Sequence, residues 1–391
     1  MRRVLSILLA TIVVACSGAA ADTTTSTTSS TTSTTSSTTT IPTTTTTIYE
    51  VEVEGADAEL AELITGLYSG EPVEAPEGVT DASAVEDLDR PTEAVAHVAD
   101  WDEETRLAVV EAGEDVTLAI ADPDWRVVGG WWPSVGDLVA LGEFPKLVVV
   151  AGSDARPGQD RERARTDSIH FVGMDAEGRA GIVGVPRDSW VPIPGAGRSK
   201  INAALSFGGP EMMMDTFVEL TGLEFDGYLL TGFEGFENLI EILGGLEIDV
   251  PRSFNDRAAK AYLEAGRQIL DASQALAMSR TRKTLPQGDF QRQEHGGLVM
   301  MAAQAMLAAQ GPATLPSLLS AAAPHFSTDF TPEDLLVLAA AVTRVDPAQT
   351  VNVVAPGGTG SAGGASVVFL RDSVDELWED LADGSLEAPE D

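Results

Sequence analysis

The sequence predicts an α/β domain over residues 131–384, preceded by a smaller accessory region and an export signal. Three short runs rich in β-branched residues, at 147–150, 169–172 and 182–185, have strand length and are bounded by Gly, Pro and Asp. Beyond them, runs with helical spacing alternate with further strand-like runs. This alternation is the pattern of an α/β domain.

Composition narrows the class of protein. The chain has 391 residues, of which 43% are hydrophobic, so it is long enough to bury a sizeable core. Its 61 acids and 24 bases give a formal net charge of -37, which argues against general affinity for nucleic acid. The scarce bases concentrate between Arg156 and Arg292. A single cysteine excludes an intrachain disulfide.

The N-terminus has the pattern of an export signal. A basic start, Met1–Arg3, precedes an apolar run at 4–15 that is too short to span a membrane comfortably. Small residues ahead of Cys16 resemble the lipobox of bacterial lipoproteins. We therefore expect a signal peptide at 1–15 and a lipid on Cys16, which would place the protein at the outer face of the bacterial cytoplasmic membrane. An ordinary signal peptide and an uncleaved anchor are the alternatives.

Residues 16–47 are a linker composed mainly of Thr and Ser. Such a tract has little apolar surface to bury and cannot offset its ordering entropy, so we expect an extended stalk. O-linked sugars or a plain disordered linker both fit this composition. At the other end of the chain, residues 385–391 are expected to form a disordered tail.

An acidic accessory region is expected at 48–130. Residues 56–68 have helical spacing, and strand-like runs follow at 94–98, 106–111 and 116–120. No chemical constellation occurs there. We interpret Trp125, Trp131 and Trp132 as packing against the main domain, with a ligand-stacking surface as the alternative.

The main domain continues with further predicted elements. After a turn at 175–178 and an edge strand at 190–194, strands are expected at 228–231, 246–250, 351–354 and 367–370. Helices are expected at 210–221, 233–243, 271–282, 298–309, 315–322, 332–343 and 372–382. The Gly-rich stretch 357–364 lacks the lysine of a phosphate-binding loop and is interpreted as a turn.

Two acids stand where the first two strands meet. Asp154 follows one strand and Asp167 begins the next, so neighbouring strands would bring them together. Magnesium typically takes one or two carboxylates together with phosphate oxygens and water, so the pair is a candidate metal site. The alternative is that one or both cap turns. No zinc spacing and no nucleophile elbow accompany them.

Arginines form a second set at the ends of the predicted elements. A diphosphate needs several cations around it, and bidentate arginines supply them best. Taken singly, each arginine is equally well a solvated surface charge or a surface ion pair. The set comprises Arg156, Arg165, Arg187, Arg280, Arg282 and Arg292, with Lys200 and Lys283.

Several short motifs in one fixed order carry a family resemblance. They include V-V-V-A-G-S-D-A-R at 148–156, R-T-D-S-I at 165–169, V-P-R-D at 185–188, K-I-N-A-A at 200–204, S-R-T-R-K at 279–283 and G-D-F-Q-R at 288–292. On these motifs, residues 146–310 resemble the LytR-CpsA-Psr family of bacterial cell-wall ligases. The resemblance implies an α-β-α domain with a central, mostly mixed sheet flanked by helices. It also implies transfer of a glycopolymer from a polyprenyl-pyrophosphate carrier to peptidoglycan.

The same resemblance assigns roles to residues. Asp154 and Asp167 match positions associated with magnesium. Asp188 is expected to orient arginines, and Asp289 to do the same or to assist proton transfer. These four acids and Arg187 are the expected catalytic residues. The expected pyrophosphate ligands are Arg156, Arg165, Arg187, Lys200, Arg280, Arg282 and Arg292.

Other interpretations remain open at this stage. A phosphatase or pyrophosphatase acting on polyprenyl pyrophosphates, or a non-catalytic protein that binds lipid-linked glycan, would use similar residues. The apolar faces at 213–217, 236–243 and 298–307 are candidates for a prenyl groove or are plain core. Where the family usually has a second arginine, three positions after Arg292, this chain has His295, which predicts a weaker or pH-dependent contact with pyrophosphate.

Overall fold

The computed structural model describes residues 49–79 and 90–388. The signal peptide, Cys16 and the stalk predicted for 1–47 lie outside the described residues. Among the described residues, no single helix is long and apolar enough to cross a membrane, and one bent pair, Asp289–Gln310 with Pro312–His325, meets the criteria of length and composition together.

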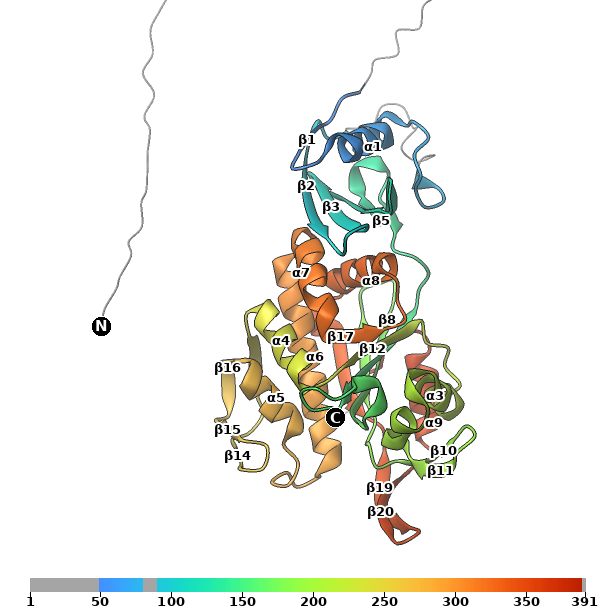
Figure 1. Ribbon diagram of the computed structural model, residues 1–391, viewed down its shortest axis with the longest axis vertical. Coiled ribbons are helices and arrows are strands. Elements are labelled where there is room, and N and C mark those ends of the chain that lie inside the picture. The colour runs from blue at the N-terminus through green and yellow to red at the C-terminus, as the bar shows by residue number, and fades with distance from the viewer. Residues whose placement is uncertain (1–48, 80–89, 389–391) are drawn as a thin grey trace, which may run out of the picture. The chain divides into compact units, whose positions relative to one another are not determined.

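The first part of the chain forms a six-stranded sheet whose strands lie side by side in chain order (Figure 1). All pairs are antiparallel except β1 with β2. The strands are β1 (Glu52–Glu54), β2 (Glu93–Asp100), β3 (Arg106–Ala112), β4 (Asp115–Ala121), β5 (Trp125–Trp132) and β6 (Leu138–Ala140). The three strands predicted for this region are therefore confirmed. The domain boundary predicted between 130 and 131 falls inside β5, because the sheet continues to Ala140.

Helix α1 (Ala58–Ser69) covers one face of this sheet. Asp57 caps its N-terminus, accepting a hydrogen bond from the Leu60 N–H at 2.9 Å. Leu60, Ile64 and Leu67 are buried against the strands, as their spacing predicts.

The tryptophans of this region are packing residues. Trp132 is fully buried and donates a hydrogen bond to Thr117 Oγ1 at 2.8 Å, inside the same core as Trp125. The prediction that they pack against the main domain is wrong for these two, which are enclosed by their own sheet. Trp131 does contact the later part of the chain, because the Arg344 guanidinium lies 4.9 Å from its ring centroid.

The second six-stranded sheet is mixed, as predicted. Its strand order is β17-β12-β7-β8-β9-β18, with β7/β12 and β9/β18 parallel and the remaining pairs antiparallel. The strands are β7 (Lys146–Ser153), β8 (Thr166–Met174), β9 (Ala180–Gly184), β12 (Gly227–Thr231), β17 (Phe326–Thr328) and β18 (Thr350–Val354). The predicted turn at 175–178 joins β8 to β9 through a hydrogen bond from Gly178 N to Asp175 O.

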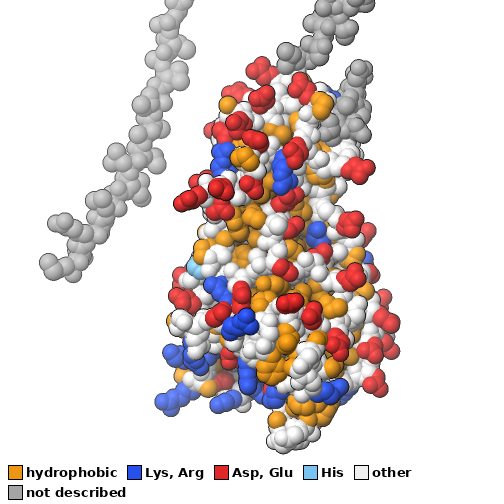
Figure 2. All heavy atoms as spheres, turned by 45° about the vertical axis from the view of Figure 1, so that its right-hand side comes forward, with side chains coloured by type: hydrophobic (Ala, Val, Ile, Leu, Met, Phe, Trp, Pro, Cys, Tyr) orange, Lys and Arg blue, Asp and Glu red, His pale blue; other side chains and the backbone are white. Residues whose placement is uncertain are grey.

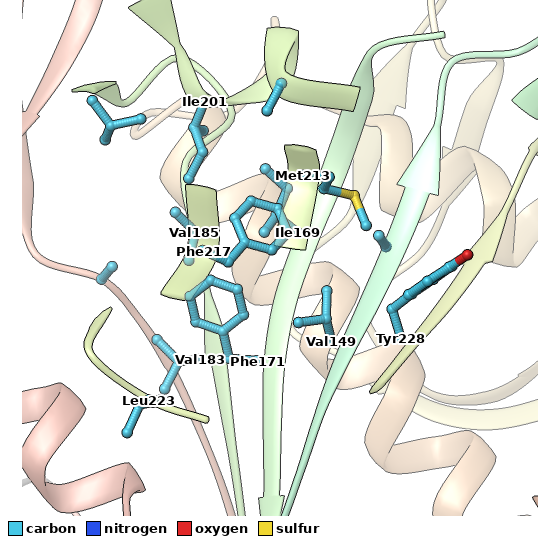
Figure 3. Packing of buried hydrophobic residues seen from close by; sticks show 14 of the residues in the cluster. Val149, Ile169, Phe171, Val183, Val185, Ile201, Met213, Phe217, Leu223 and Tyr228 are labelled. Carbon is cyan, nitrogen blue, oxygen red and sulfur yellow. The ribbon is translucent and has the colours of Figure 1, made fainter. Parts of the chain in front are cut away.

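One face of this sheet carries a closely packed core beneath α3 (Ala204–Thr221) and α9 (Val374–Leu381). Figure 3 shows Phe171 of the sheet turned toward Phe217 of α3, with Val183 in the same cluster. The Phe171 and Phe217 ring centroids are 5.2 Å apart. Met213 and Phe217 are fully buried there, so the interpretation of 213–217 as prenyl groove is wrong and its core alternative holds.

Helices α4 (Phe233–Leu243), α5 (Ala272–Arg280), α6 (Asp289–Gln310), α7 (Leu315–Ala322) and α8 (Pro332–Arg344) lie on the other side (Figure 1). α-β-α layering is thus the observed fold. The helix expected at 298–309 begins nine positions earlier, and the one expected at 271–282 ends at Arg280. Gly296 and Gly297 obscure the helical pattern of α6. They let α6 approach the sheet, since a Cβ at Gly296 would lie 2.6 Å from the His170 ring.

Several peripheral predictions are corrected. The expected edge strand at 190–194 is β10 (Trp190–Ile193), which pairs with β11 (Gly197–Lys200) outside the main sheet. The Gly-rich turn is strand β19 (Gly357–Ala362), in a hairpin with β20 (Ala365–Leu370). The tail expected to be disordered from 385 packs at Leu386, which belongs to the core around α9.

Two small hairpins complete the fold. The predicted strand β13 (Leu246–Val250) pairs with β16 (Gly266–Leu270), and β14 (Phe254–Asp256) pairs with β15 (Ala261–Leu263). Their buried side chains share a core with α5 and with Val299 of α6.

Candidate functional site

A cavity of about 690 Å³ lies between the second sheet and helices α4 to α8. Its strand residues include Val150, Val172, Ile182 and Leu229, which are the side chains that alternate with those of the closed core. Its helical residues include Phe236, Leu239, Leu243, Val299, Met300 and Leu307. The stretches 236–243 and 298–307, predicted as groove or core, therefore line a cavity.

The two ends of the cavity differ in chemistry. Met174, Ala180 and Val345 line the end where β8 finishes and β9 begins. Charged residues line the opposite end, where β7 and β12 finish and β8 begins. An apolar chain with a charged head would fit such a cavity.

Asp154 and Asp167 both line the charged end. Asp154 Oδ1 accepts a hydrogen bond from Arg165 N at 3.0 Å, and Asp154 N donates to Arg165 O at 2.8 Å. The turn-capping alternative thus holds for Asp154, yet its carboxylate still lines the cavity. Next to Asp154 in the chain, Ser153 lines the same cavity, and its buried hydroxyl has no hydrogen-bond partner among the described residues.

Three arginines at this end share three acids. Arg187 donates to Asp167, and Arg282 Nη2 lies 3.2 Å from Asp188 Oδ2. Arg292 Nη2 donates to the Asp167 carbonyl oxygen and lies 2.8 Å from Asp289 Oδ1. The predicted meeting of the early acids with the late arginines is therefore observed.

Asp289 is the centre of this network. It is the first residue of α6 and is 7% exposed. Its Oδ2 accepts a hydrogen bond from Arg187 N at 3.0 Å, and its Oδ1 lies 3.8 Å from the Nε atoms of both Arg187 and Arg282. Asp289 contacts the arginines without lining the cavity itself.

The pKa values reflect this mutual compensation. Burial lowers the pKa of Arg292, with Asp289 and Asp167 opposing the shift. Burial acts in the same direction on Arg187, but the charge of Asp167 and its hydrogen bond outweigh it and raise the pKa. Burial disfavours the charged form of Asp188, yet the hydrogen bond from Lys200 and the charges around it keep its pKa below the usual range.

Three further cations line the cavity without such compensation. Arg156, Arg280 and Lys283 have no carboxylate within ion-pair distance among residues 49–79 and 90–388. The Arg280 guanidinium lies 4.4 Å from the Phe233 ring centroid. Figure 2 shows Lys and Arg side chains gathered toward the lower end of the drawn face. Arg156, Arg280 and Lys283 are therefore available to an anionic ligand.

Two predicted ligands are not at the cavity. Arg165 contributes its backbone to Asp154, while its side chain is exposed and absent from the lining. Lys200 Nζ lies 2.7 Å from Asp188 Oδ1, which also stands outside the lining. Asp188 lies within ion-pair distance of both Lys200 and Arg282, while the orienting role predicted for it stays a prediction. Both corrections arise because strand direction and ion pairing, which spacing does not encode, decide where a side chain points.

His295 also stands away from the cavity lining. Its ring is buried and lies 4.9 Å from the Phe254 ring centroid. Neither ring nitrogen has a hydrogen-bond partner among the described residues. Burial, with the nearby charge of Arg252, lowers the pKa of His295 to about 4.

Sequence reasoning missed several lining residues, among them Ser153, Phe233 and Asp256. Ser153 lies within the motif at 148–156, but a serine at that position did not by itself indicate a role at the site. Phe233 was predicted only as a helix start. Asp256 comes from β14 and accepts hydrogen bonds from Ala258 N at 2.9 Å and Arg282 N at 3.4 Å, a long-range placement without a local pattern.

No group of three or more His, Cys, Asp and Glu side chains suited to holding a metal occurs in the described part of the chain. A metal bound by one or two carboxylates plus substrate oxygens would not need such a group. Asp154 and Asp167, which both line the charged end, would supply the one or two carboxylates that such a site needs.

Comparisons with known proteins agree with this geometry. The model of the LytR_cpsA_psr family matches residues 142–383. A protein of Corynebacterium glutamicum named "Probable cell wall biosynthesis protein LcpB" is 37% identical over 156 residues, covering 37% of each chain. The teichoic acid transferase TagV of Bacillus subtilis, named as acting from polyisoprenyl-teichoic acid to peptidoglycan, is 32% identical over 142 residues, 34% of this chain and 36% of TagV. The like-named TagU of Bacillus mycoides is 32% identical over 160 residues, covering 40% of this chain and 51% of TagU.

The matches to these relatives span about a third to a half of their own length. Among solved structures, B. subtilis TagV superimposes with a TM-score of 0.54 at 23% identity, over 62% of this chain and 99% of TagV. TagT bound to LI-WTA superimposes with a TM-score of 0.51 at 22% identity, over 62% of this chain and 92% of TagT. At these identities the solved structures show that the fold is shared.

Proposed function

The chain belongs to the LytR-CpsA-Psr family, and from this premise we propose that it transfers a glycopolymer from a polyprenyl-pyrophosphate carrier to peptidoglycan. One observation carries the proposal. A single cavity is apolar along its length and ends in arginines and acids drawn from segments more than a hundred residues apart in the chain. A lipid pyrophosphate has the complementary distribution of apolar tail and anionic head.

The apolar part of the cavity would hold the prenyl tail. Each buried methylene contributes about 0.8 kcal/mol, so partial insertion of a long isoprenoid would supply substantial binding energy. Leu239 and Leu243 of α4 and Leu307 of α6 would face it.

The charged end would hold the pyrophosphate. Arg156, Arg280 and Lys283 have no internal counter-charge and would contact the anion first. Arg187, Arg282 and Arg292 are held in place by their acids and would present fixed guanidiniums. Fixed donors stabilise developing charge without reorganising, which is the main source of catalysis in such sites.

Magnesium would be held by Asp154 and Asp167, with the Ser153 hydroxyl beside them. When bound, it would neutralise charge on the phosphate oxygens. Asp188 and Asp289 would act through the arginines they position.

The reaction exchanges one phosphorus–oxygen bond for another. An acceptor sugar hydroxyl bonds to the phosphorus that carries the polymer, and the bond from that phosphorus to the bridging oxygen breaks. The polyprenyl phosphate leaves with the electron pair. The hydroxyl proton passes to a carboxylate at the cavity or to a phosphate oxygen. Charge neutralisation by the arginines makes this leaving group a good one.

A transfer assay tests the proposal. The full chain is incubated with a polyprenyl-pyrophosphate glycan, peptidoglycan and magnesium, and polymer attached to peptidoglycan is measured. We expect attachment by the wild type, with loss of about a hundredfold or more on chelation of magnesium or in Asp154→Asn. Release of free polymer without attachment would instead identify a lipid-pyrophosphate hydrolase. Donor binding with neither product would identify a non-catalytic binding protein.

A further inference from the structure

A second hollow lies on the outer side of α6. It is a groove of about 590 Å³, hereafter the outer groove. Strands β18 and β19 and the beginning of α6 form its walls. The lining residues used below are Phe290, Glu294, Asn352, Gly358, Thr359 and Arg371.

Helix α6 separates the outer groove from the cavity. Arg292 and Gly296 line the cavity, whereas Phe290 and Glu294, four residues apart on one helical face, line the outer groove. The groove runs along β18, which is the edge strand of the second sheet. Both hollows are thus lined by residues of the first turns of α6, which begins at Asp289.

The outer groove is also fixed to the charged end through the β19–β20 hairpin. Val368 N of β20 donates a hydrogen bond to the Asp188 carbonyl oxygen at 2.9 Å. On β19, a Cβ at Gly357 would lie 3.3 Å from the Phe290 ring, so the hairpin packs closely on α6. A ligand in the groove would thus be held in a set position relative to Asp188 and Asp289.

The chemistry of the groove differs from that of the cavity. It combines one aromatic ring with a carboxylate, two amides, a hydroxyl and a guanidinium, and it opens to solvent at Glu294, Gly358, Thr359 and Arg371. Neither Glu294 nor Arg371 has an ion-pair partner among the described residues. The Asn352 amide donates to the Glu294 carbonyl oxygen at 2.9 Å, which ties β18 to α6. Mixed, spaced polar groups beside an aromatic face suit a neutral polyhydroxylated ligand better than a lipid or a polyanion.

We propose that the outer groove binds the saccharide strand of the acceptor, with Glu294 and Arg371 as its main hydrogen-bonding side chains. This inference rests on the proposed function, because it concerns the second substrate of that reaction. It assigns donor and acceptor to opposite sides of α6, and places the acceptor hydroxyl near the helix end that carries Asp289.

Binding and kinetics of three variants test it. Glu294→Gln and Arg371→Gln each remove charge from the groove, and Glu219→Gln, on the exposed side of α3 at the opposite face of the sheet, is the matched control. Binding of an N-acetylglucosamine–N-acetylmuramic acid oligomer is measured by calorimetry on the full chain. The transfer assay gives kcat, the acceptor KM and the donor KM.

We expect the oligomer Kd and the acceptor KM to rise about fivefold or more in each groove variant, the loss of roughly one charged hydrogen bond. The donor KM and kcat should stay within about twofold of wild type, and Glu219→Gln should match wild type throughout. Equal oligomer binding by all three variants, or none by the wild type, would overturn the inference. Oligomer binding that depends on Glu294 and Arg371 in a protein that transfers no polymer would leave the inference standing and reject the proposed function.

Discussion

The two ends of the cavity are built in different ways. At the charged end, Arg187, Arg282 and Arg292 are held by acids from β8, from the loop after β9 and from the start of α6. At the apolar end, side chains such as Val172, Leu243 and Leu307 supply shape and volume without specific partners. The charged end is formed by specific contacts between individual atoms, whereas the apolar end is formed by the space left between the helices and the sheet.

This difference teaches where substitutions should matter. Removing one member of a buried ion-pair network leaves an uncompensated charge, which costs several kcal/mol. Apolar linings tolerate exchange as long as volume is kept. Truncating a single side chain at the charged end should therefore reduce transfer activity. At the apolar end, activity should fall only when a larger side chain fills the space.

The largest effect is expected for Arg292→Ala. Arg292 is 6% exposed and touches both Asp167 and Asp289, so its loss removes one cationic partner from each of two acids in a buried network. We expect transfer to fall about 1000-fold and stability by about 3 kcal/mol, measured by the transfer assay and by urea unfolding. Arg292→Lys keeps the charge without the planar fork and should recover stability more than activity. Full activity in Arg292→Ala would contradict the assigned role of the network.

A smaller effect is expected for Arg280→Ala, at the same end but outside the network. Its guanidinium stacks on Phe233 and has no acid partner among the described residues. Donor binding should weaken roughly tenfold to a hundredfold, with stability within about 0.5 kcal/mol of wild type. A loss of stability equal to that of Arg292→Ala would erase the distinction between compensated and free arginines.

Placing a larger side chain at the apolar end of the cavity should weaken the binding of donors with a long prenyl tail. Ala303 lines the cavity, whereas Ala309, six residues later on α6, is exposed and outside the lining. We expect Ala303→Phe to weaken binding of a full-length polyprenyl donor by about tenfold and to spare a short-chain analogue, while Ala309→Phe changes neither. Equal weakening of both donors by Ala303→Phe would show that the tail does not occupy this space.

The smallest effect on transfer is expected from His295, which lies outside the cavity. Its folded pKa of about 4 is below the ordinary value of 6.5, so the unfolded chain takes up the proton first as pH falls. The stability contributed by the neutral ring is present above pH 6.5 and is lost toward pH 4. When the pH falls from 7 to 5, the free energy of unfolding of His295→Leu, measured with urea, should decrease by about 2 kcal/mol less than that of the wild type. Transfer activity at pH 7 should be nearly unchanged. An identical pH dependence in both proteins would reject this account.

Local patterns in the sequence were enough for most elements of the two sheets and for α4 and α7, because alternation and helical spacing report which faces are buried. They failed at α6, where Gly296 and Gly297 look like helix breakers. Those glycines instead allow contact with His170 and Asn352, a requirement set by residues that lie far away in the chain.

The sequence by itself determined the family, a set of candidate acids and arginines, and the presence of apolar stretches. Only the tertiary structure decided which arginines are compensated, because ion pairs such as Arg292 with Asp167 depend on segments that meet only in the folded chain. It also separated 213–217, which is core, from 236–243 and 298–307, which line the cavity. Both kinds of stretch have the same spacing, and the face of the sheet they cover is fixed by chain topology alone.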